Sequence, residues 1–332
     1  MIIKRSLTLN ALLALSALLY AMYLAMLPID GFIDRDNYLQ YVQNSGFLLS
    51  SNLGESYLYL FSNEPLWLLI NQIVGYFLSP EDGVRVLIFF GASVFYFASG
   101  KEIFGRRNDL MRLWLVFLFV VFSPQILKNF VIHLRQGVAL AVFFLFAGTD
   151  KTLKRNVFAA LLTAQIHSSF YFLFFILGSL YFFDRFGFSK RKSMVATCVA
   201  ILILAPLASL GSIFFEARQG LLVDDSIVAS GAAFVFWSVA ITVLFFSLLK
   251  NKTDCDDWRF CFSFCAILLY LSLYYSFTYS GRIFESCLPL VVISLLTLPY
   301  SRLKFLLVML SGLFVYQWSP LLSGDSIFRL AS

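Results

Sequence analysis

The sequence predicts an all-α fold, a polytopic transmembrane bundle of about 10–12 membrane segments that include short or re-entrant helices. Three observations predict it. Hydrophobic residues make up 60% of the 332 residues and charged residues only 13%, whereas a soluble domain carries about 25% charged residues. The mean hydropathy is +0.83. Apolar runs recur along the whole chain, so we expect a single integral membrane domain over residues 1–332.

The apolar segments differ in length. A helix needs about 20 residues to cross a bilayer, and several segments reach or approach that length while others fall short. The first run follows Lys4 and Arg5, is longer than the core of a signal peptide and has no A-x-A site before Pro28, so we interpret it as an uncleaved first span. The segments lie near residues 9–29, 65–79, 84–99, 113–127, 134–149, 157–167, 169–183, 195–213, 231–249, 260–277, 283–299 and 304–319.

The distribution of Lys and Arg predicts the orientation, because cytoplasmic connections retain positive charge. Eighteen of the 25 cationic residues gather in six clusters, which we place in the cytoplasm. The clusters are Lys4/Arg5, Lys101/Arg106/Arg107/Arg112, Lys151/Lys154/Arg155, Arg185/Lys190/Arg191/Lys192, Lys250/Lys252/Arg259 and Arg302/Lys304. Of the other seven, Arg85 has no clear side, and the following six fall on the opposite face: Arg35, Lys128, Arg135, Arg218, Arg282 and Arg329.

Two stretches do not fit a simple series of bilayer crossings. Residues 65–99 join an outer to a cytoplasmic connection and must therefore cross an odd number of times, yet they hold two apolar segments. We expect 65–79 to be re-entrant or to lie in the outer interface. The alternative moves one end of the stretch to the other side of the membrane. Residues 156–183 number fewer than the roughly 40 needed for two spans. We expect two short helices there, meeting at the polar turn Gln165–Ser169.

The first outer connection, residues 30–64, carries groups suited to a sugar substrate. Carboxylates can accept sugar hydroxyls or take a proton from them. Glu64 also precedes Pro65, which suits the first turn of a helix, so a solvated acidic loop with a capping Glu explains the segment equally well. The candidate catalytic residues are Asp34, Asp36 and Glu64, and the candidate substrate-binding residues are Arg35 and Tyr38.

An ionisable residue opens the Ala-rich apolar segment that follows residue 133. Arg135 sits at or just below the predicted outer surface, and its planar guanidinium suits phosphate oxygens. Lys128 shares its face only if one helix continues between them. His133 and Gln136 flank Arg135 and are candidate substrate-binding residues. The alternative for Arg135 is snorkelling to lipid headgroups.

Two further positions complete the set of candidates. His167 is one of only two His in the chain and suits proton transfer near neutral pH, although a buried His bonded to a neighbouring helix fits as well. Arg282 opens a late segment at the outer face, either as an anion-binding group or paired with Glu285 one helical turn on. The second outer connection, residues 214–230, holds the weaker candidate Arg218.

Several kinds of site are not indicated. The five Cys have no zinc-binding spacing and fit small buried hydrophobes. The chain has neither an H-E-x-x-H motif nor a Gly-rich phosphate loop, so we expect no metal site and no ATP-driven machinery.

Taken in order along the chain, the motifs resemble the EpsG family of Wzy-type polysaccharide polymerases. Each motif alone is weak, and their order and spacing over nearly the whole chain carry the resemblance. The chain differs in its short central outer connection, residues 214–230. The motifs are Asp34-Arg35-Asp36-Asn37-Tyr38, Asn63-Glu64-Pro65, Leu134-Arg135-Gln136-Gly137, His167-Ser168-Ser169 and Gly281-Arg282-Ile283.

The resemblance implies a metal-independent glycosyltransferase without a cofactor, in the bacterial cytoplasmic (inner) membrane with its active site facing the periplasm. Its donor and acceptor would be oligosaccharide repeat units on undecaprenyl diphosphate, joined into O-antigen, capsule or exopolysaccharide. Other expected partners are membrane lipid and a chain-length regulator, but not nucleic acid. The diphosphate would be held by fixed cations. Arg135 and Arg282 are the first candidates for this role, with Arg218 and Lys128 in reserve.

Two other functions fit parts of the pattern. A flippase for the same lipid-linked sugar would also use cations, but it predicts symmetry between halves, which the sequence does not show. A membrane acyltransferase that modifies surface glycans could use His as its base. It should place a His among the first spans, and the first 60 residues contain none.

Overall fold

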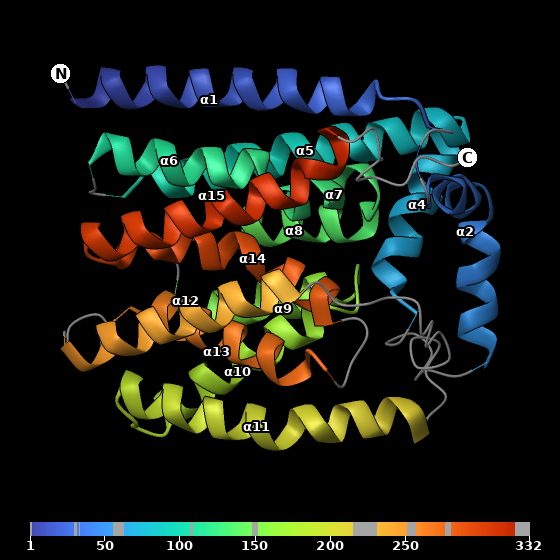
Figure 1. Ribbon diagram of the computed structural model, residues 1–332. Coiled ribbons are helices and arrows are strands. Elements are labelled where there is room, and N and C mark those ends of the chain that lie inside the picture. Colours follow the sequence, from blue (N-terminus) through green and yellow to red (C-terminus); the bar gives the residue numbers. More distant parts are fainter. Residues whose placement is uncertain are drawn as a thin grey trace. The chain divides into compact units, whose positions relative to one another are not determined.

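The computed structural model describes residues 2–29, 32, 34–55, 63–106, 109–147, 152–214, 231–250, 257–275 and 280–322, and every element within these ranges is a helix (Figure 1). The chain forms two compact units, residues 1–171 with 318–332 and residues 172–317. The all-α prediction is confirmed. The helices of the first unit are α1 (Ile2–Ala25), α2 (Arg35–Glu55), α4 (Pro65–Phe77), α5 (Pro80–Phe104), α6 (Leu110–Phe122), α7 (Pro124–Val131), α8 (Leu134–Phe146) and α9 (Leu153–Ala164).

The remaining helices belong mainly to the second unit. They are α10 (Phe170–Arg185), α11 (Lys190–Phe214), α12 (Gly231–Lys250), α13 (Trp258–Leu273), α14 (Ser280–Ser294), the short 3-10 helix η2 (Leu295–Thr297) and α15 (Tyr300–Leu322). The apolar segments expected from the sequence each correspond to one of these helices, except that 113–127 is divided between α6 and α7, and 283–299 between α14 and η2.

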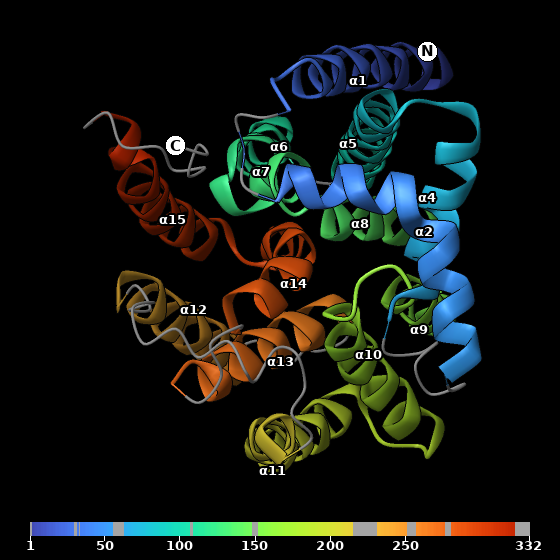
Figure 2. The same ribbon diagram turned by 90° about the vertical axis from the view of Figure 1, so that its right-hand side faces the viewer.

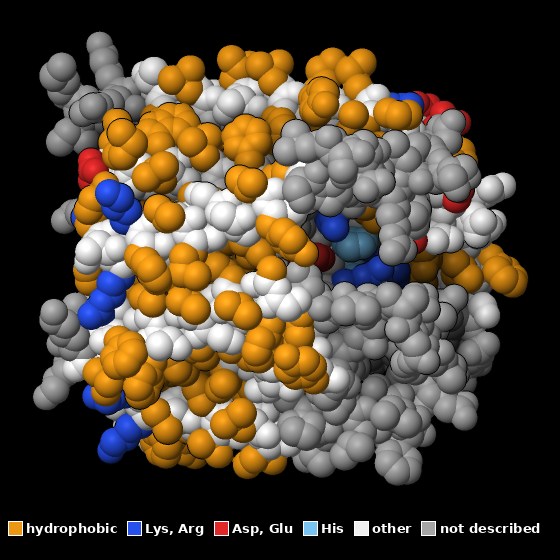
Figure 3. All heavy atoms as spheres, in the orientation of Figure 1, with side chains coloured by type: hydrophobic (Ala, Val, Ile, Leu, Met, Phe, Trp, Pro, Cys, Tyr) orange, Lys and Arg blue, Asp and Glu red, His pale blue; other side chains and the backbone are white. Residues whose placement is uncertain are grey.

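Within the described ranges, four helices are long and apolar enough to cross a membrane, and a fifth crossing is formed if α6 and α7, bent by 45° at Ser123, make one broken span. The four are Thr8–Ala25, Pro80–Phe104, Gly231–Leu249 and Ser280–Thr297. Many large hydrophobic side chains stay exposed on the helices, as Figure 3 shows, which suits lipid contact. The chain is therefore a multi-pass membrane protein built from long and short helices.

Helix α5 forms the core of the first unit, where it lies between α1 and α8 (Figure 2). Small residues let the neighbouring helices approach, since a Cβ at Gly91 would already be in contact with Val138. Phe95 is fully buried, and its ring lies 5.2 Å from that of Phe130 and 5.3 Å from that of Phe144. This aromatic packing fixes α7, which carries Lys128, and α8, which carries Arg135, against α5.

Helices α2 and α4 run across the direction of α1, α5 and α8 rather than along it (Figures 1 and 2). Most of the outer connection predicted over residues 30–64 is helix α2, which the sequence analysis missed. The two helices pack closely, because a Cβ at Gly75 would collide with the carbonyl oxygen of Val42. Helix α4 has only 13 residues, as expected for a segment that does not span the bilayer.

Residues 80–83, which separate the apolar segments 65–79 and 84–99, form the first turn of α5. The Ser79 hydroxyl caps the helix by accepting a hydrogen bond from the Asp82 amide at 3.3 Å. Pro80 occupies the first helical position, and the negative charges of Glu81 and Asp82 lie at the positive end of the helix dipole. The group that divides the two apolar segments is thus a helix start signal.

Two of the seven isolated cations cap the end of α1. Arg35 is 1% exposed, and its guanidinium donates hydrogen bonds to the carbonyls of Leu27 at 3.1 Å, Pro28 at 2.8 Å and Val131 at 3.0 Å. Arg85 donates to the carbonyl of Ala25 at 2.9 Å. These carbonyls lie at and just beyond a helix C-terminus, where partners are lacking and positive charge is favoured. Arg35 therefore has a structural role here, in place of the substrate contact expected from the sequence.

The two short helices predicted around residue 167 are confirmed. Helix α9 ends at Ala164, α10 begins at Phe170, and the polar turn Gln165–Ser169 joins them. The Gln165 side chain donates to the hydroxyl of Tyr171 at 2.7 Å, which ties the turn to the start of α10.

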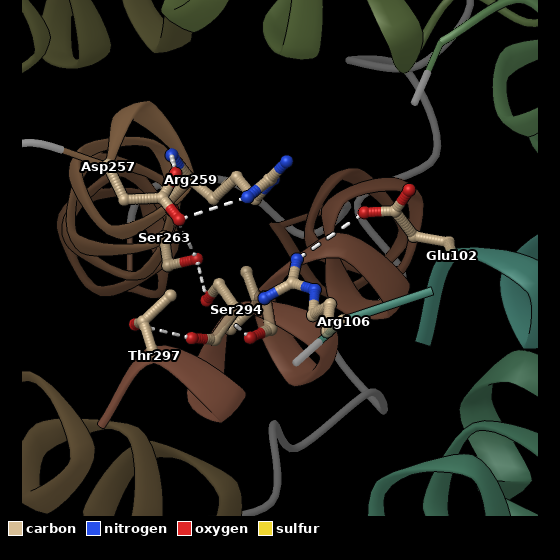
Figure 4. A network of polar contacts seen from close by, with 8 residues as sticks. Glu102, Arg106, Asp257, Arg259, Ser263, Ser294 and Thr297 are labelled. Atoms are coloured by element: carbon tan, nitrogen blue, oxygen red, sulfur yellow. Dashed lines mark hydrogen bonds and ion pairs between the residues drawn. The ribbon is translucent and has the colours of Figure 1, made fainter. Parts of the chain in front are cut away.

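The second unit is organised around α13, which contacts α11, α12 and α14. The Ser263 hydroxyl of α13 is hydrogen-bonded to the Ser294 hydroxyl of α14, beside the Asp257–Arg259 pair at the start of α13 (Figure 4). Cys198 and Cys265 approach to 3.7 Å between their sulfur atoms. The described cysteines are unbridged: Cys198 is partly buried, and Cys261, Cys265 and Cys287 are buried. Cys255 lies outside the described residues.

Candidate functional site

Three of the predicted motifs, widely separated in sequence, meet in the first unit. Glu64 lies directly before α4, Arg135 lies in the first turn of α8, and Ser168 lies in the turn between α9 and α10. The Arg135 Nη1 atom is 2.6 Å from Glu64 Oε2, and the Ser168 amide donates to Glu64 Oε1 at 2.9 Å. We call these three residues, with His167, which directly precedes Ser168 in the turn, the Glu64 cluster. Both carboxylate oxygens of Glu64 are thus occupied.

The polar turn and the start of α4 are joined through their backbones. The amides of Leu66 and Trp67 both donate to the Gln165 carbonyl, at 3.1 and 3.4 Å. The first amides of a helix have no partner within it, so an outside acceptor stabilises the helix start. This contact sets the distance between the α9–α10 turn and Glu64, and it explains why a polar turn lies among apolar helices.

The ion pair is only partly shielded from solvent. The Glu64 side chain is 9% exposed, whereas that of Arg135 is 33% exposed. The Arg135 guanidinium also lies 5.4 Å from the ring centre of Tyr41, close enough for a cation–π contact. Arg135 therefore keeps an accessible surface while a carboxylate and an aromatic ring hold it in place.

Tyr38 of α2 is a second aromatic neighbour of Arg135. Burial raises the pKa of Tyr38 to about 12, although the positive charge of Arg135 acts to lower it. The phenol is therefore protonated near neutral pH. Rings of Tyr38 and Tyr41 both meet Trp67 edge-on, with centroids 5.9 and 6.2 Å away. Helices α2 and α4 thus form an aromatic support for the Arg135 side chain.

Gly137 has a specific steric role two residues after Arg135. A Cβ at this position would lie 2.9 Å from the carbonyl carbon of Asn129 and closer still to its oxygen. Carbon atoms normally approach to no less than about 3.5 Å, so only glycine allows α8 to start this close to α7. Because Gly137 lies two residues after Arg135, its close contact with the Asn129 carbonyl also fixes the position of the Arg135 guanidinium.

The hydrogen bonds of His167 assign its protons. Its Nδ1 atom accepts from the Ser169 amide at 3.2 Å and lies 2.7 Å from the Ser169 hydroxyl. An amide can only donate, so Nδ1 carries no proton and the neutral ring is protonated at Nε2. In this arrangement His167 presents an N–H donor at Nε2 rather than a base.

Two acidic residues of the first outer connection have left-handed backbone conformations. Glu64 has φ 54° and Asp34 has φ 74°, values that cost about 1–2 kcal/mol for residues other than glycine. Strain of this kind is often concentrated at functional sites. The left-handed backbone at Glu64 turns its carboxylate away from α4. The side chain makes no capping hydrogen bond to that helix and instead reaches Arg135.

The other candidates in this unit take different positions. Helix α7 ends at Val131 and α8 begins at Leu134, so Lys128 and Arg135 do not share one helical face. Gln136 is fully buried and His133 is half-buried at the N-cap of α8, while Asp36 is exposed at the start of α2. Asp34 is half-buried, and its carboxylate lies 3.5 Å from the Asn37 amide group.

Two candidates lie elsewhere. Arg282 belongs to the second unit, where it is exposed in the first turn of α14. Arg218, with most of the outer connection 214–230, lies outside the described residues. Within the described part of the chain, no group of three or more His, Cys, Asp or Glu is arranged to bind a metal ion.

The sequence analysis missed Tyr41 and Trp67 as members of the site. Tyr41 follows Tyr38 at helical spacing, which would have indicated one shared face had α2 been predicted as a helix. No model of a protein family, no curated protein and no solved structure matches this chain.

Proposed function

We propose that this protein is a membrane glycosyltransferase that joins oligosaccharide repeat units carried on undecaprenyl diphosphate into a surface polysaccharide. The observation that carries the proposal is the Glu64 cluster. It joins the Arg135 guanidinium to the Glu64 carboxylate and bonds that carboxylate to the turn that carries His167. In the sequence, the order of these three motifs resembles that of a Wzy-type polymerase.

The leaving group of this reaction explains the need for Arg135. When the bond from the sugar to the lipid diphosphate breaks, negative charge develops on a phosphate oxygen, and fixed positive charge stabilises it. A guanidinium offers several donors in one plane, which suits phosphate oxygens better than an ammonium does. Arg135 is one-third exposed and is held by Glu64 and Tyr41, so it can receive an anion without large movement.

The histidine completes the proposed chemistry. With its proton on Nε2, His167 can donate a hydrogen bond to a phosphate oxygen beside Arg135 or to a sugar hydroxyl. The donor chain would pass from its lipid diphosphate to a hydroxyl of the next lipid-linked unit, releasing undecaprenyl diphosphate.

The test is the surface glycan of a strain that lacks this gene. A lost polymerase leaves a single repeat unit on the surface carrier, and the wild-type gene restores the ladder of chain lengths. A lost flippase leaves no repeat unit at all, and a lost acyltransferase leaves long polymer without its acyl groups. Either of the last two results would refute the proposed function.

A substitution series then tests the site. Arg135→Ala and His167→Ala should lose the ladder while remaining at wild-type level in the membrane. Arg191→Ala is the control, because Arg191 is exposed at the start of α11 in the second unit. A normal ladder from both site variants would refute the assignment of the site.

A further inference from the structure

An anionic substrate that binds Arg135 would compete with Glu64 for its guanidinium. A diphosphate that binds Arg135 meets a guanidinium whose Nη1 atom already donates to a carboxylate at 2.6 Å. Glu64 adds a negative charge beside the position where the anionic substrate should bind. A carboxylate retained at an anion site weakens binding unless it can give up its contact.

The candidate bases differ in how they are placed. His167 accepts the Ser169 amide at Nδ1 and carries its proton at Nε2, so it acts as a donor. Asp36 is exposed on α2, and Asp34 faces its neighbour Asn37. Of the four acidic or histidine candidates, Glu64 is the carboxylate in direct contact with Arg135.

We infer that Glu64 and Arg135 form a displaceable ion pair, in which a lipid diphosphate takes over the guanidinium and so frees the Glu64 carboxylate to accept the proton of the attacking sugar hydroxyl. This inference rests on the proposed function. It assigns one residue two states, first a counter-ion that holds Arg135 in place and then a general base.

The geometry permits this exchange while the Glu64 side chain stays in place. Glu64 keeps the Ser168 amide on Oε1 when Oε2 is released, and its left-handed backbone directs the side chain toward α8. The exchange is also favourable in charge, because a diphosphate bears more negative charge than one carboxylate and binds the planar guanidinium through two oxygens. Arg135 is partly exposed, so the pair is weaker than a fully buried one.

The proposed step balances. The hydroxyl oxygen of the acceptor sugar forms a bond to the anomeric carbon of the donor, and its proton passes to Glu64. The bond from the anomeric carbon to the phosphate oxygen breaks, and its electron pair stays on the lipid diphosphate beside Arg135. Glu64 then releases its proton to water and returns to Arg135 when the lipid diphosphate leaves.

The test separates binding from turnover by using Glu64→Gln, which keeps the shape and an acceptor for Ser168 but removes the charge. Binding is measured with undecaprenyl diphosphate and the full-length protein in detergent micelles. We expect Glu64→Gln to bind this probe about threefold more tightly, a modest gain for a partly exposed pair, while polymer formation falls at least about 100-fold. Glu102→Gln is the matched control, since it removes the charge from another ion pair, with Arg106, in the same unit.

A double variant shows whether the effect passes through Arg135. Arg135→Gln should bind undecaprenyl diphosphate more weakly, and in that background Glu64→Gln should bring no gain. Unchanged or weaker binding by Glu64→Gln, or an equal gain without Arg135, would overturn the displaceable pair. Wild-type polymer formation by Glu64→Gln would overturn its role as base. Failure of the wild-type protein to make polymer would instead refute the proposed function, and the binding comparison would still decide the ion pair.

Discussion

The position of Arg135 depends on a close contact between α7 and α8, and Gly137→Ala tests that dependence. A Cβ at residue 137 would lie 2.9 Å from both the Asn129 carbonyl carbon and the Phe130 ring. Relief to a normal contact needs a shift of about 0.6–1 Å. Overpacking of this kind costs about 1–3 kcal/mol, and the same shift disturbs the 2.6 Å contact between Arg135 and Glu64.

The assay is thermal unfolding of the purified protein in detergent, together with the surface-polymer ladder. We expect Gly137→Ala to lower the midpoint by about 1–5 °C, since about 1 kcal/mol corresponds to roughly 1–2 °C for a chain of 332 residues. The matched control is Gly178→Ala in α10, where a Cβ meets nothing within 4 Å. Alanine is the better helix former there and should be neutral or stabilising by up to about 1 kcal/mol. Equal midpoints for the two variants would refute the steric account.

Three further substitutions or treatments test the packing. Arg35→Ala leaves carbonyls at the end of α1 without their donor, so it should lower the free energy of unfolding, measured by chemical denaturation, by about 2–4 kcal/mol. A loss below about 0.5 kcal/mol would contradict the structural role of Arg35. Ser79→Ala removes the cap of α5 and should cost about 1 kcal/mol in the same assay, whereas Ser79→Asp should not. Mild oxidation with copper phenanthroline should join Cys198 and Cys265, whose sulfurs lie 3.7 Å apart, and thiol counting on denatured protein would show no change if α11 and α13 were packed differently.

Hydrophobic length and charge placement predicted most of the helices, because both are local properties of the chain. The 13-residue apolar run that begins at Pro65 is too short to span a bilayer in any fold. The polar turn after Ala164 likewise divides another apolar run into two short helices. Helix α2 was missed because its many polar residues obscured the helical spacing of Tyr38, Val42 and Ser45, which are buried. That face becomes recognisable only when α4 and α5 are in place against it.

The isolated cations illustrate the difference between residue type and residue role. Composition and position marked Arg35 and Arg135 in the same way, as positive charges on the outer side. Tertiary contacts separate them: Arg35 is buried and donates to three backbone carbonyls, whereas Arg135 is one-third exposed beside a carboxylate. The sequence around each arginine does not reveal this difference, because the carbonyls and the carboxylate come from other segments of the chain.

From the amino-acid order alone, the helical membrane architecture, the short helices and the motifs with Glu64, Arg135 and His167 were predictable, since burial in lipid and helix length act within each segment. The meeting of these residues depends instead on α4 docking its free amides on the Gln165 carbonyl and on α8 packing tightly at Gly137. Both contacts join parts of the chain far apart in sequence, and local patterns carry no information about such distances. The proton arrangement of His167 likewise follows from the folded turn, where the Ser169 amide meets Nδ1.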